Sequence, residues 1–293
     1  MVKKLKFAVL GDPIEHSLSP EIHKEFAEQF ELSITYERLK TTKNALSTTL
    51  NRLIKQKYTG VNITVPLKED VFLFASQPKF EISDRAMISK SINTVSFNRC
   101  KFFADNTDGA GLVAAVSRLG IKDLAGKNIL ILGVGGATKG ILEPLLRMKP
   151  KTIHLANRSL ERLRKFRNQF TYKNLLFHDI QEFKGKSRNL PQIENGLDNF
   201  KFDVIVNATS LSLIGGDNLI SNKWFEKCFL AIDLMYSKKP TSFMMQAMEQ
   251  NVNVVIDGLP MLVEQAAESF SLWTGLKPET EHVHAVAKKL IEL

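Results

Sequence analysis

The chain has 293 residues and a formal net charge of +9, with 44% hydrophobic and 24% charged residues. Its length allows two domains with substantial cores, and its composition excludes a disordered or fibrous protein. Apolar runs stay short of the roughly 18–20 residues that span a bilayer, so we expect no membrane partner. The first of these runs ends at Asp12 and Pro13, which predicts a β-strand rather than a signal peptide.

The positive charge is scattered along the chain rather than gathered into a nucleic-acid-binding motif. Only the stretch 158–167 is densely basic, and it lacks zinc-finger spacing, an aromatic RNP motif and a helix-turn-helix signature. The charge therefore favours a small polyanionic ligand over nucleic acid. Cys100 and Cys228 form neither a CxxC pair nor a metal-binding spacing, which favours a reducing, cytoplasmic setting without a disulfide or a bound metal.

Strand and helix signals alternate through the first part of the chain, as in α/β proteins. Ser19 is expected to cap the first amphipathic helix, with Pro20 at its first position. Strands are predicted at 6–11, 34–39, 61–66, 93–98 and 101–106, the last two as a hairpin. Helices are predicted at 20–30, 45–54, through Phe72 and Phe74, and from 109 to 120.

The predicted strand at 61–66 has an unusual polar face. Its apolar residues, Val65 included, alternate with Asn62 and Thr64, which predicts that the apolar side chains face the core. A proline ends the strand, and Lys68 follows it directly. We expect Asn62, Thr64 and Lys68 to face a ligand rather than bulk solvent.

A second series of strands begins near Leu124. Nearly continuous apolar runs are typical of parallel strands that helices cover on both faces. These runs lie at 127–133, 152–157, 175–180, 203–210, 229–236 and 252–258. Because helical patterns separate them, the series predicts a doubly wound parallel sheet, followed by helices from Met261 onward. The polar stretch 184–201 is the segment least typical of regular structure.

A glycine-rich turn, GVGGATKG at 133–140, follows the first of these strands and opens a helix. Gly133 permits a tight turn, and Gly135 and Gly136 allow the backbone to approach a pyrophosphate at the helix N-terminus. Thr138 stands where the usual third glycine of the dinucleotide fingerprint lies. The pattern alone therefore leaves open a glycine turn without a ligand.

The end of the next strand favours NADP(H) over NAD. An NAD site would carry an acidic residue here for the ribose 2′-hydroxyl, whereas this chain has no carboxylate before Glu161. It carries instead an amide, a hydroxyl and two guanidinium groups, which suit a 2′-phosphate: Asn157, Ser159, Arg158 and Arg162. The alternative is a solvated helix start, but positive charge in a first helical turn opposes the helix dipole.

Polar residues recur at the strand ends of the first third, where open α/β folds place their ligands. They are Ser17, Ser19, Asn62, Thr64, Lys68, Asn93, Asn106, Thr107 and Asp108. Each has a structural explanation on its own, such as a helix cap, a turn residue or a solvated helix start. Together they suit a small polyhydroxy carboxylate.

These motifs, taken in order, resemble those of shikimate dehydrogenases across nearly the whole chain. The matching stretches are GDPIEHSLSPEIH, GVNITVPLK, NTV, DNTDG, GVGGAT, NRS, NATS, DLMY and DGLPMLVEQAAESFSLWTG. Only the glycine turn is shared widely with other dehydrogenases. The resemblance implies two α/β domains separated by a cleft: a discontinuous substrate-binding domain at 1–108 plus 258–293, and a Rossmann-type NADP-binding domain at 109–257.

The resemblance also implies a role for individual residues. Lys68 and Asp108 would form the catalytic pair. The substrate would be held by Ser17, Ser19, Asn62, Thr64, Asn93, Tyr236 and Gln265. The cofactor would be held by Gly133, Gly135, Gly136, Ala137, Asn157, Arg158, Ser159, Arg162, Thr209, Gly258 and Met261.

The implied activity is the NADPH-dependent, reversible reduction of 3-dehydroshikimate to shikimate in the biosynthesis of chorismate and the aromatic amino acids. We expect a cytoplasmic monomer or homodimer that binds no nucleic acid. One alternative is a quinate/shikimate dehydrogenase that uses NAD, although the acidic residue expected near Asn157 is missing. Another is a non-catalytic protein that binds NADP or nucleic acid, which the joint presence of Lys68 and Asp108 disfavours.

The chain departs from the family pattern at three places. Lys90 and Ser91 stand where a Gly–Ala pair often precedes the asparagine of the NTV motif. Pro260 stands where a glycine is common, and LSLIGGD at 211–217 replaces a tighter turn after NATS. The first two departures concern loop conformation, and the third concerns the shape of a loop on the cofactor side.

Overall fold

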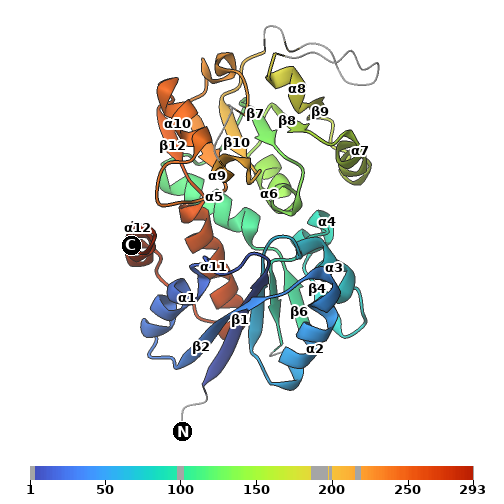
Figure 1. The fold of residues 1–293 in the computed structure, drawn as a ribbon, viewed down its shortest axis with the longest axis vertical. Helices are drawn as coiled ribbons and strands as arrows, with labels where there is room; N and C mark the ends of the chain where they lie inside the picture. The colour runs from blue at the N-terminus through green and yellow to red at the C-terminus, as the bar shows by residue number, and fades with distance from the viewer. Residues whose placement is uncertain (1–3, 98–101, 186–196, 198–199, 215–218, 293) are drawn as a thin grey trace. The chain divides into compact units, whose positions relative to one another are not determined.

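The computed structural model describes residues 4–97, 102–185, 197, 200–214 and 219–292 (Figure 1). Contacts within the chain divide it into two compact units. Unit 1 comprises Met1–Leu119, Lys139–Pro144 and Pro260–Leu293, and unit 2 comprises Gly120–Thr138 and Leu145–Leu259. Cys100 and most of the stretch 184–201 lie outside the described residues.

Helix α5 (Asp108–Arg118) belongs to unit 1 by its contacts. Two glycines explain how closely it packs there. A Cβ atom on Gly109 would lie 2.3 Å from Pro144 Cγ, and one on Gly111 would lie 2.7 Å from Gln265 Cβ. The family resemblance instead implies an NADP-binding domain that starts at residue 109. The domain boundaries that it implies describe functional domains and stay a prediction.

Unit 1 is built on a mixed six-stranded sheet with the order β2-β1-β3-β5-β6-β4. Its strands are β1 (Leu5–Gly11), β2 (Ile34–Lys40), β3 (Gly60–Ile63), β4 (Phe80–Ile82), β5 (Thr94–Ser96) and β6 (Phe102–Asp105). Strand β1 runs parallel to β2 and β3, whereas β5 runs antiparallel to β3 and β6. The predicted hairpin at 93–106 is therefore confirmed.

Helices cover both faces of this sheet, because alternate residues of β1 point to opposite sides. Ala8 and Leu10 join a buried cluster with side chains of α2 and α3, such as Leu50. On the other face, Phe7 stacks on Trp273 of α11 with ring centroids 4.7 Å apart. The remaining helices of unit 1 are α1 (Ser19–Glu28), α2 (Leu46–Lys55), α3 (Lys68–Ala75), α4 (Asp84–Ser89), α11 (Leu259–Thr274) and α12 (Glu281–Glu292), with a 3-10 turn η1 (Lys43–Ala45).

Two local expectations in unit 1 are wrong. Helix α1 begins at Ser19, whose side chain does not cap it; instead the Ser19 backbone N–H donates to Ser17 Oγ at 3.3 Å. Val65 does not face the core but is 59% exposed, because β3 ends at Ile63 and the chain has already turned. The alternation of residue types continues past the end of the strand.

Unit 2 is built on a six-stranded sheet with the order β12-β11-β10-β7-β8-β9, and every strand pair is parallel. Its strands are β7 (Asn128–Leu132), β8 (Thr152–Asn157), β9 (Leu175–Asp179), β10 (Val204–Asn207), β11 (Leu230–Asp233) and β12 (Val254–Ile256). The predicted doubly wound sheet is confirmed. The strand order reverses between β7 and β10, which is where such folds bind dinucleotides.

Helices pack on both faces of the parallel strands, which accounts for the almost uninterrupted apolar runs. A buried cluster of Leu130, Leu132, Phe183, Phe202 and Trp224 marks part of this core. The helices are α7 (Leu160–Gln169), α8 (Ile180–Phe183), α9 (Leu211–Ile214) and α10 (Ser242–Glu249), with a 3-10 turn η2 (Asn222–Phe225). Helix α6 (Gly136–Arg147) begins and ends in unit 2, whereas its residues Lys139–Pro144 belong to unit 1 by their contacts. Within the described ranges, no helix combines the length and the apolar character needed to cross a membrane.

Candidate active site

A buried ion pair joins the starts of two helices in unit 1. Lys68 begins α3 and Asp108 begins α5, and Lys68 Nζ donates to Asp108 Oδ2 at 2.5 Å. Their side chains are 14% and 4% exposed. A carboxylate suits the first turn of α5, whereas a cation opposes the dipole of α3, so the pairing with Asp108 stabilises the lysine. The backbone O of Lys68 also accepts from Ile92 N at 2.9 Å, which ties α3 to the segment before Asn93.

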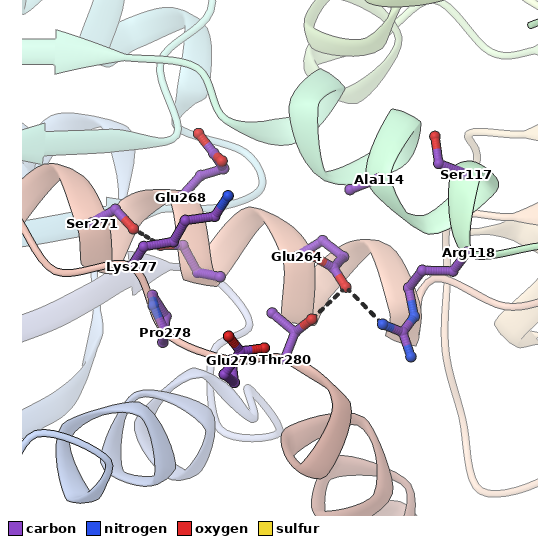
Figure 2. Close-up of a pocket in the computed structure, with 11 residues that line it drawn as sticks. Ala114, Ser117, Arg118, Glu264, Glu268, Ser271, Lys277, Pro278, Glu279 and Thr280 are labelled. Carbon is purple, nitrogen blue, oxygen red and sulfur yellow. Dashed lines mark hydrogen bonds and ion pairs between the residues drawn. The ribbon is translucent and has the colours of Figure 1, made fainter. Parts of the chain in front are cut away.

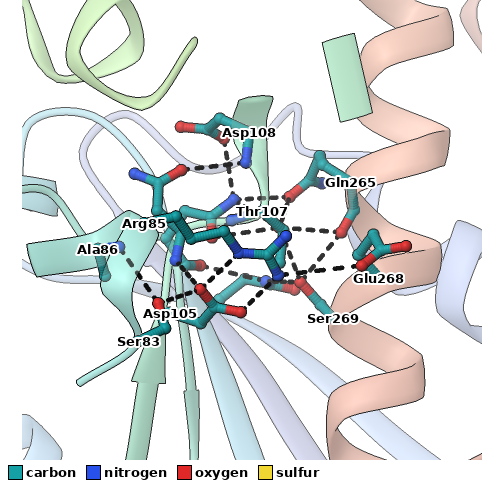
Figure 3. Close-up of polar contacts among 12 residues, drawn as sticks. Ser83, Arg85, Ala86, Asp105, Thr107, Asp108, Gln265, Glu268 and Ser269 are labelled. Carbon is teal, nitrogen blue, oxygen red and sulfur yellow. Dashed lines mark hydrogen bonds and ion pairs between the residues drawn. The ribbon is translucent and has the colours of Figure 1, made fainter. Parts of the chain in front are cut away.

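The side-chain amide of Asn93 connects Asp108 to Gln265 of α11; Figure 3 labels both of these partners. Its Nδ2 donates to Thr107 Oγ1 and Asp108 Oδ1, both at 2.9 Å, and to Gln265 Oε1 at 3.0 Å. Its Oδ1 accepts from Thr107 N at 2.8 Å. All four residues are buried. The network therefore fixes the free oxygen of Asp108 as well as the one that meets Lys68.

Asn62 extends the polar network along the sheet. Its Nδ2 donates to Ser269 Oγ at 3.0 Å and to the backbone O of Asn93 at 3.2 Å, and its Oδ1 accepts from the Tyr36 hydroxyl at 2.7 Å. Burial raises the pKa of Tyr36, and a hydrogen bond with Ser19 opposes that shift. Tyr36 thus links Asn62 to the serine pair.

Ser17 and Ser19 lie in the turn between β1 and α1, and Ser17 Oγ donates to Ser19 Oγ at 3.1 Å. Arg38 holds this turn, because its Nε donates to the Ser17 backbone O at 2.7 Å while its Nη2 binds the Glu21 carboxylate. Thr64 follows β3, and its methyl group would lie 2.4 Å from a Cβ on Gly11, so the two turns pack closely. The structure therefore brings together six of the seven predicted substrate residues within unit 1.

The glycine turn of unit 2 has the geometry of an anion site. Gly133 takes a left-handed conformation with φ +101°, and a Cβ there would lie 2.9 Å from Thr209 Cγ2. Gly135 directly precedes α6, and nothing lies within 4 Å of where its Cβ would be. Among the described residues no side chain caps this helix and its first turn, where Ala137 lies, carries no acid. These residues fit the pyrophosphate of a dinucleotide.

Asn207 and Asp233, at the ends of β10 and β11, support the loop that carries Thr209. Asn207 Nδ2 donates to Asp233 Oδ1 at 2.9 Å and to Thr209 O at 3.1 Å, and its Oδ1 accepts from Thr209 Oγ1 at 2.7 Å. Asp233 also accepts from the Thr241 hydroxyl at 2.6 Å. Burial raises the pKa of Asp233, outweighing these hydrogen bonds.

The residues predicted to hold a 2′-phosphate lie at the end of β8 and the start of α7. Asn157 Nδ2 donates to Ser159 O at 3.1 Å, and Ser159 Oγ caps α7 by accepting from Arg162 N at 3.3 Å. The side chains of Arg158 and Arg162 are exposed. Two exposed guanidinium groups beyond the carboxyl end of β8 fit the extra phosphate of NADP(H).

Three further predicted residues lie at or near the ends of β11 and β12. Tyr236 follows β11 in unit 2, and Gly258 follows β12, where a Cβ would lie 2.2 Å from Leu234 O. Met261 lies in α11, in the part that belongs to unit 1. The positions of these residues against a substrate and a nicotinamide stay predictions.

The departures from the family pattern are accommodated locally. Lys90 ends α4 in the left-handed region with φ 48°, where glycine has no steric cost. Ser91 is fully buried, and its backbone O accepts from Asn106 Nδ2 at 2.9 Å. Pro260 occupies the first turn of α11, where proline is tolerated. Residues 211–214 form α9, whereas 215–218 lie outside the described residues.

Two polar residues of the network, Tyr36 and Ser269, had no role in the sequence prediction, and both contact Asn62. Asn106 was expected near a ligand, and its Oδ1 accepts from Asp108 N at 3.0 Å. Ser269 lies one helical turn after Gln265 on the same face of α11, a spacing that the sequence contains. Tyr36 has no comparable signal, because a tyrosine in an alternating strand is also an ordinary packing residue.

A separate pocket of about 520 Å³ lies in unit 1 between α5, α11 and the segment before α12 (Figure 2). Glu264 lies at its centre and accepts from Thr280 Oγ1 at 2.9 Å and contacts His284 Nε2 at 2.7 Å. Burial raises the pKa of Glu264, but His284, Thr280 and Arg118 outweigh it and hold that pKa below its usual value. None of the residues that line this pocket is a predicted site residue.

Comparisons with known proteins match nearly the whole chain. Residues 9–95 match the shikimate dehydrogenase substrate binding domain, residues 115–229 match shikimate/quinate 5-dehydrogenase, and residues 258–288 match the shikimate 5'-dehydrogenase C-terminal domain. The NADP(+) shikimate dehydrogenase of Chromobacterium violaceum is 36% identical over 287 residues, which cover 98% of both chains. That of Ruthia magnifica is 41% identical over 282 residues, covering 95% of this chain and 97% of the relative.

Solved structures show the same similarity. The shikimate 5-dehydrogenase of Thermus thermophilus, in complex with NADP(H) and shikimate, has 30% sequence identity and a TM-score of 0.80. The match covers 97% of this chain and 99% of that structure. The sequence identity over nearly full length, the two α/β units and the matched domains together show that the chain belongs to the shikimate dehydrogenase family.

Proposed function

We propose that the chain catalyses the NADP-dependent, reversible reduction of 3-dehydroshikimate to shikimate in aromatic amino acid biosynthesis. The observation that carries the proposal is the buried Lys68–Asp108 ion pair, 2.5 Å long, beside a network of neutral amides and hydroxyls. A positive charge held at such a point can stabilise an oxyanion that forms from a ketone. The family membership and the glycine turn of unit 2 support the same activity.

Lys68 is the proposed acid of the reduction. Reduction adds a hydride to the carbonyl carbon and a proton to its oxygen, and NADPH supplies the hydride when it is bound. The Lys68 ammonium donates the proton to the oxygen and then regains one from water; in the reverse direction the neutral amine accepts it. Asp108 accepts a hydrogen bond from Lys68 Nζ at 2.5 Å and so fixes the position of the ammonium group.

The neutral polar groups are proposed to recognise the substrate. Asn62, Thr64, Asn93 and Gln265 offer donors and acceptors for ring hydroxyls, with Ser17, Ser19 and Tyr236 completing the set. A site built to bond hydroxyl groups discriminates strongly against analogues that lack them, because its own polar groups are then left unpaired. The substrate is thus a polyhydroxy acid rather than a simple hydroxy acid.

The cofactor is proposed to bind unit 2 at its switch point. Gly133, Gly135, Gly136 and Ala137 lie against the pyrophosphate, Arg158 and Arg162 with Asn157 and Ser159 bind the 2′-phosphate, and Thr209, Gly258 and Met261 border the rest of the molecule. The proposal includes the functional domains at 1–108 plus 258–293 and at 109–257, and a cytoplasmic location.

An absorbance assay at the NADPH band tests the proposal. Purified protein with shikimate and NADP⁺ is expected to form NADPH, faster than with quinate or with NAD⁺. Higher rates with quinate and NAD⁺ would instead support the quinate/shikimate alternative. Cofactor binding without any shikimate-dependent NADPH formation would overturn the proposal in favour of a non-catalytic NADP-binding protein.

A further inference from the structure

Arg85 forms a two-pronged ion pair with Asp105, close in sequence to the proposed catalytic carboxylate (Figure 3). Its Nε donates to Asp105 Oδ1 at 2.7 Å and its Nη2 donates to Asp105 Oδ2 at 2.5 Å. The Asp105 side chain is 4% exposed, whereas that of Arg85 is 34% exposed. Paired parallel hydrogen bonds of this kind fix the plane of a carboxylate as well as its charge.

Asp105 uses its remaining acceptor capacity on groups that shape the start of the turn at 106–108. Its Oδ1 accepts from the Ser83 hydroxyl and from the backbone N–H of Asn106, the latter at 2.7 Å. Burial raises the pKa of Asp105, but the bonds from Arg85, Ser83 and Asn106 outweigh it and hold that pKa below its usual value. Asp105 is therefore a charged anchor at the end of β6.

The anchored turn leads directly to Asp108. Asn106 Oδ1 accepts from the backbone N–H of Asp108 at 3.0 Å, and Asn106 Nδ2 donates to the backbone O of Ser91 at 2.9 Å. Thr107 donates its backbone N–H to Asn93 Oδ1 at 2.8 Å. Each residue of the turn is thus held by a hydrogen bond, and the first of these bonds is the one to Asp105. A rotation of the Asp105 carboxylate would loosen the turn at its origin.

Arg85 also connects the three elements that carry the network. It belongs to α4, which leads into Asn93; it binds the end of β6, which leads into Asp108; and its Nη2 lies 3.9 Å from Glu268 Oε2 on α11, one turn after Gln265. Ser83 strengthens this junction, because its Oγ caps α4 by accepting from Ala86 N at 3.2 Å. A single guanidinium group therefore contacts both β6 and α11 from α4. These are the elements that lead into Asp108, carry Gln265 and lead into Asn93.

We propose that Arg85, acting through Asp105, is a positioning residue that sets the place of the Asp108 carboxylate against Lys68. The inference rests on the proposed function, because Asp108 is a proposed catalytic group. Lysine at this position would keep the charge but lose the planar fork. Arg85→Lys therefore separates orientation of the carboxylate from simple charge compensation.

The kinetic test compares kcat and KM in Arg85→Lys with those of the unmodified protein. We expect kcat to fall about tenfold or more, since small displacements of a catalytic group have large effects on rate. The KM for NADP⁺ should stay within about twofold, because the cofactor residues lie elsewhere in the chain. Arg118→Lys is the matched control, because Arg118 is also partly exposed, at 35%, and pairs with Glu281 and Glu264. The kcat of this variant should be unchanged.

A second readout does not depend on activity. Hydrogen exchange of the backbone amides of 106–108 should be faster in Arg85→Lys, while β1 and β3 keep their protection. Unchanged exchange at 106–108, or an unchanged kcat in the folded variant, would overturn the inference. A kcat that falls only in proportion to the folded fraction, measured by thermal unfolding, would also overturn it and leave Arg85 a structural ion pair.

The two proposals fail in different ways. If the unmodified protein forms no NADPH from shikimate, the proposed function fails, and exchange at 106–108 still decides whether Arg85 positions the turn. If the unmodified protein is active but Arg85→Lys behaves like Arg118→Lys in both measurements, only the positioning role fails. Asp105→Asn gives an independent check, because it removes the charge and keeps the shape of the side chain; it should repeat the effects of Arg85→Lys.

Discussion

Units 1 and 2 both carry polar groups at the carboxyl ends of their strands, but they hold them in different ways. In unit 1, Asn93, Asp108 and Gln265 are buried and bond to one another. In unit 2, the groups proposed to contact the cofactor are an open glycine turn and the exposed side chains of Arg158 and Arg162. The Asn207 and Asp233 pair that supports the Thr209 loop is buried.

The difference suits the two kinds of ligand. A small polyhydroxy acid must be read hydroxyl by hydroxyl, which requires side chains that are already oriented by their neighbours. A dinucleotide has phosphates that backbone N–H groups and exposed cations can bind without such a network. Substitutions in unit 1 should therefore affect turnover, whereas substitutions of the arginines in unit 2 should affect cofactor affinity alone.

The largest expected effect is that of Lys68→Ala. Removing the ammonium group takes away the proposed proton donor, so kcat should fall by at least about 10²-fold, with a smaller change in KM for shikimate. Steady-state kinetics of the purified variant measures this. Lys43→Ala is the control, because it removes a lysine from an ion pair with Asp70 of α3 that is 2.6 Å long. An unchanged kcat in Lys68→Ala would rule out its catalytic role.

Arg158→Ala should show the opposite pattern. Losing a charge-assisted bond to the 2′-phosphate, at about 1.5–3 kcal/mol, should raise the KM for NADP⁺ about tenfold or more. Since Arg158 is exposed, the melting temperature and kcat should change little. The exposed Arg164, on α7, the helix that follows Arg158, provides a control in Arg164→Ala. Equal losses with NADP⁺ and NAD⁺ would show that Arg158 does not read the 2′-phosphate.

A buried histidine should make the folded protein sensitive to acid. His154 is 2% exposed in unit 2, and burial, followed by the charge of the neighbouring His178, lowers its pKa from 6.5 to about 3. Because the folded pKa lies below the unfolded value, its contribution to stability is complete above pH 6.5 and is lost as the pH falls toward 3. The contribution changes by up to about 1.4 kcal/mol per pH unit.

Denaturant unfolding of His154→Gln and of the unmodified protein tests this loss of stability. Measurements from about pH 8 to about pH 4 cover most of the titration of His154. The stability difference from the unmodified protein should be largest at the alkaline end and should shrink as the pH falls. His23 of unit 1 is the counterpart, since burial lowers its pKa to about 3 as well. A difference that stays constant with pH would mean that His154 titrates alike in the folded and unfolded chains.

The smallest expected effect is a gain in stability from Lys90→Gly. Lys90 has φ 48°, and relief of a left-handed conformation should add about 0.5–1 kcal/mol to the free energy of unfolding, partly offset by the greater freedom of glycine in the unfolded chain. Lys55→Gly, at the last residue of α2, should destabilise instead, by up to about 1 kcal/mol. Thermal unfolding separates the two, and a loss of stability in Lys90→Gly would contradict the explanation.

The periodicity of apolar residues predicted which helices and strands form better than it predicted where they begin and end. The hairpin at 93–106 and the six parallel strands of unit 2 follow from short-range patterns of apolar residues. Val65 and Ser19 were misjudged because both lie where an element begins or ends, and an end depends on the backbone turn rather than on residue type.

The candidate site divides in the same way. Lys68, Asn93 and Asp108 stood out because polar residues followed predicted strands. Tyr36 and Ser269 did not, since each is unremarkable within its own strand or helix. Arg85 and Asp105 were missed because an arginine near a helix start has an ordinary explanation on the surface. Only their two-pronged contact distinguishes them.

What the sequence determined by itself is local: the alternating α/β elements, the glycine turn after β7, and the absence of an acidic residue near Asn157. What only the tertiary structure decided is which polar groups meet. Lys68 reaches Asp108 across 40 residues, and Asn93 reaches Gln265 across 172. These contacts exist because β5 pairs between β3 and β6 while α11 packs on the same sheet. Such pairing is set by burial of whole faces, which no short stretch of sequence contains.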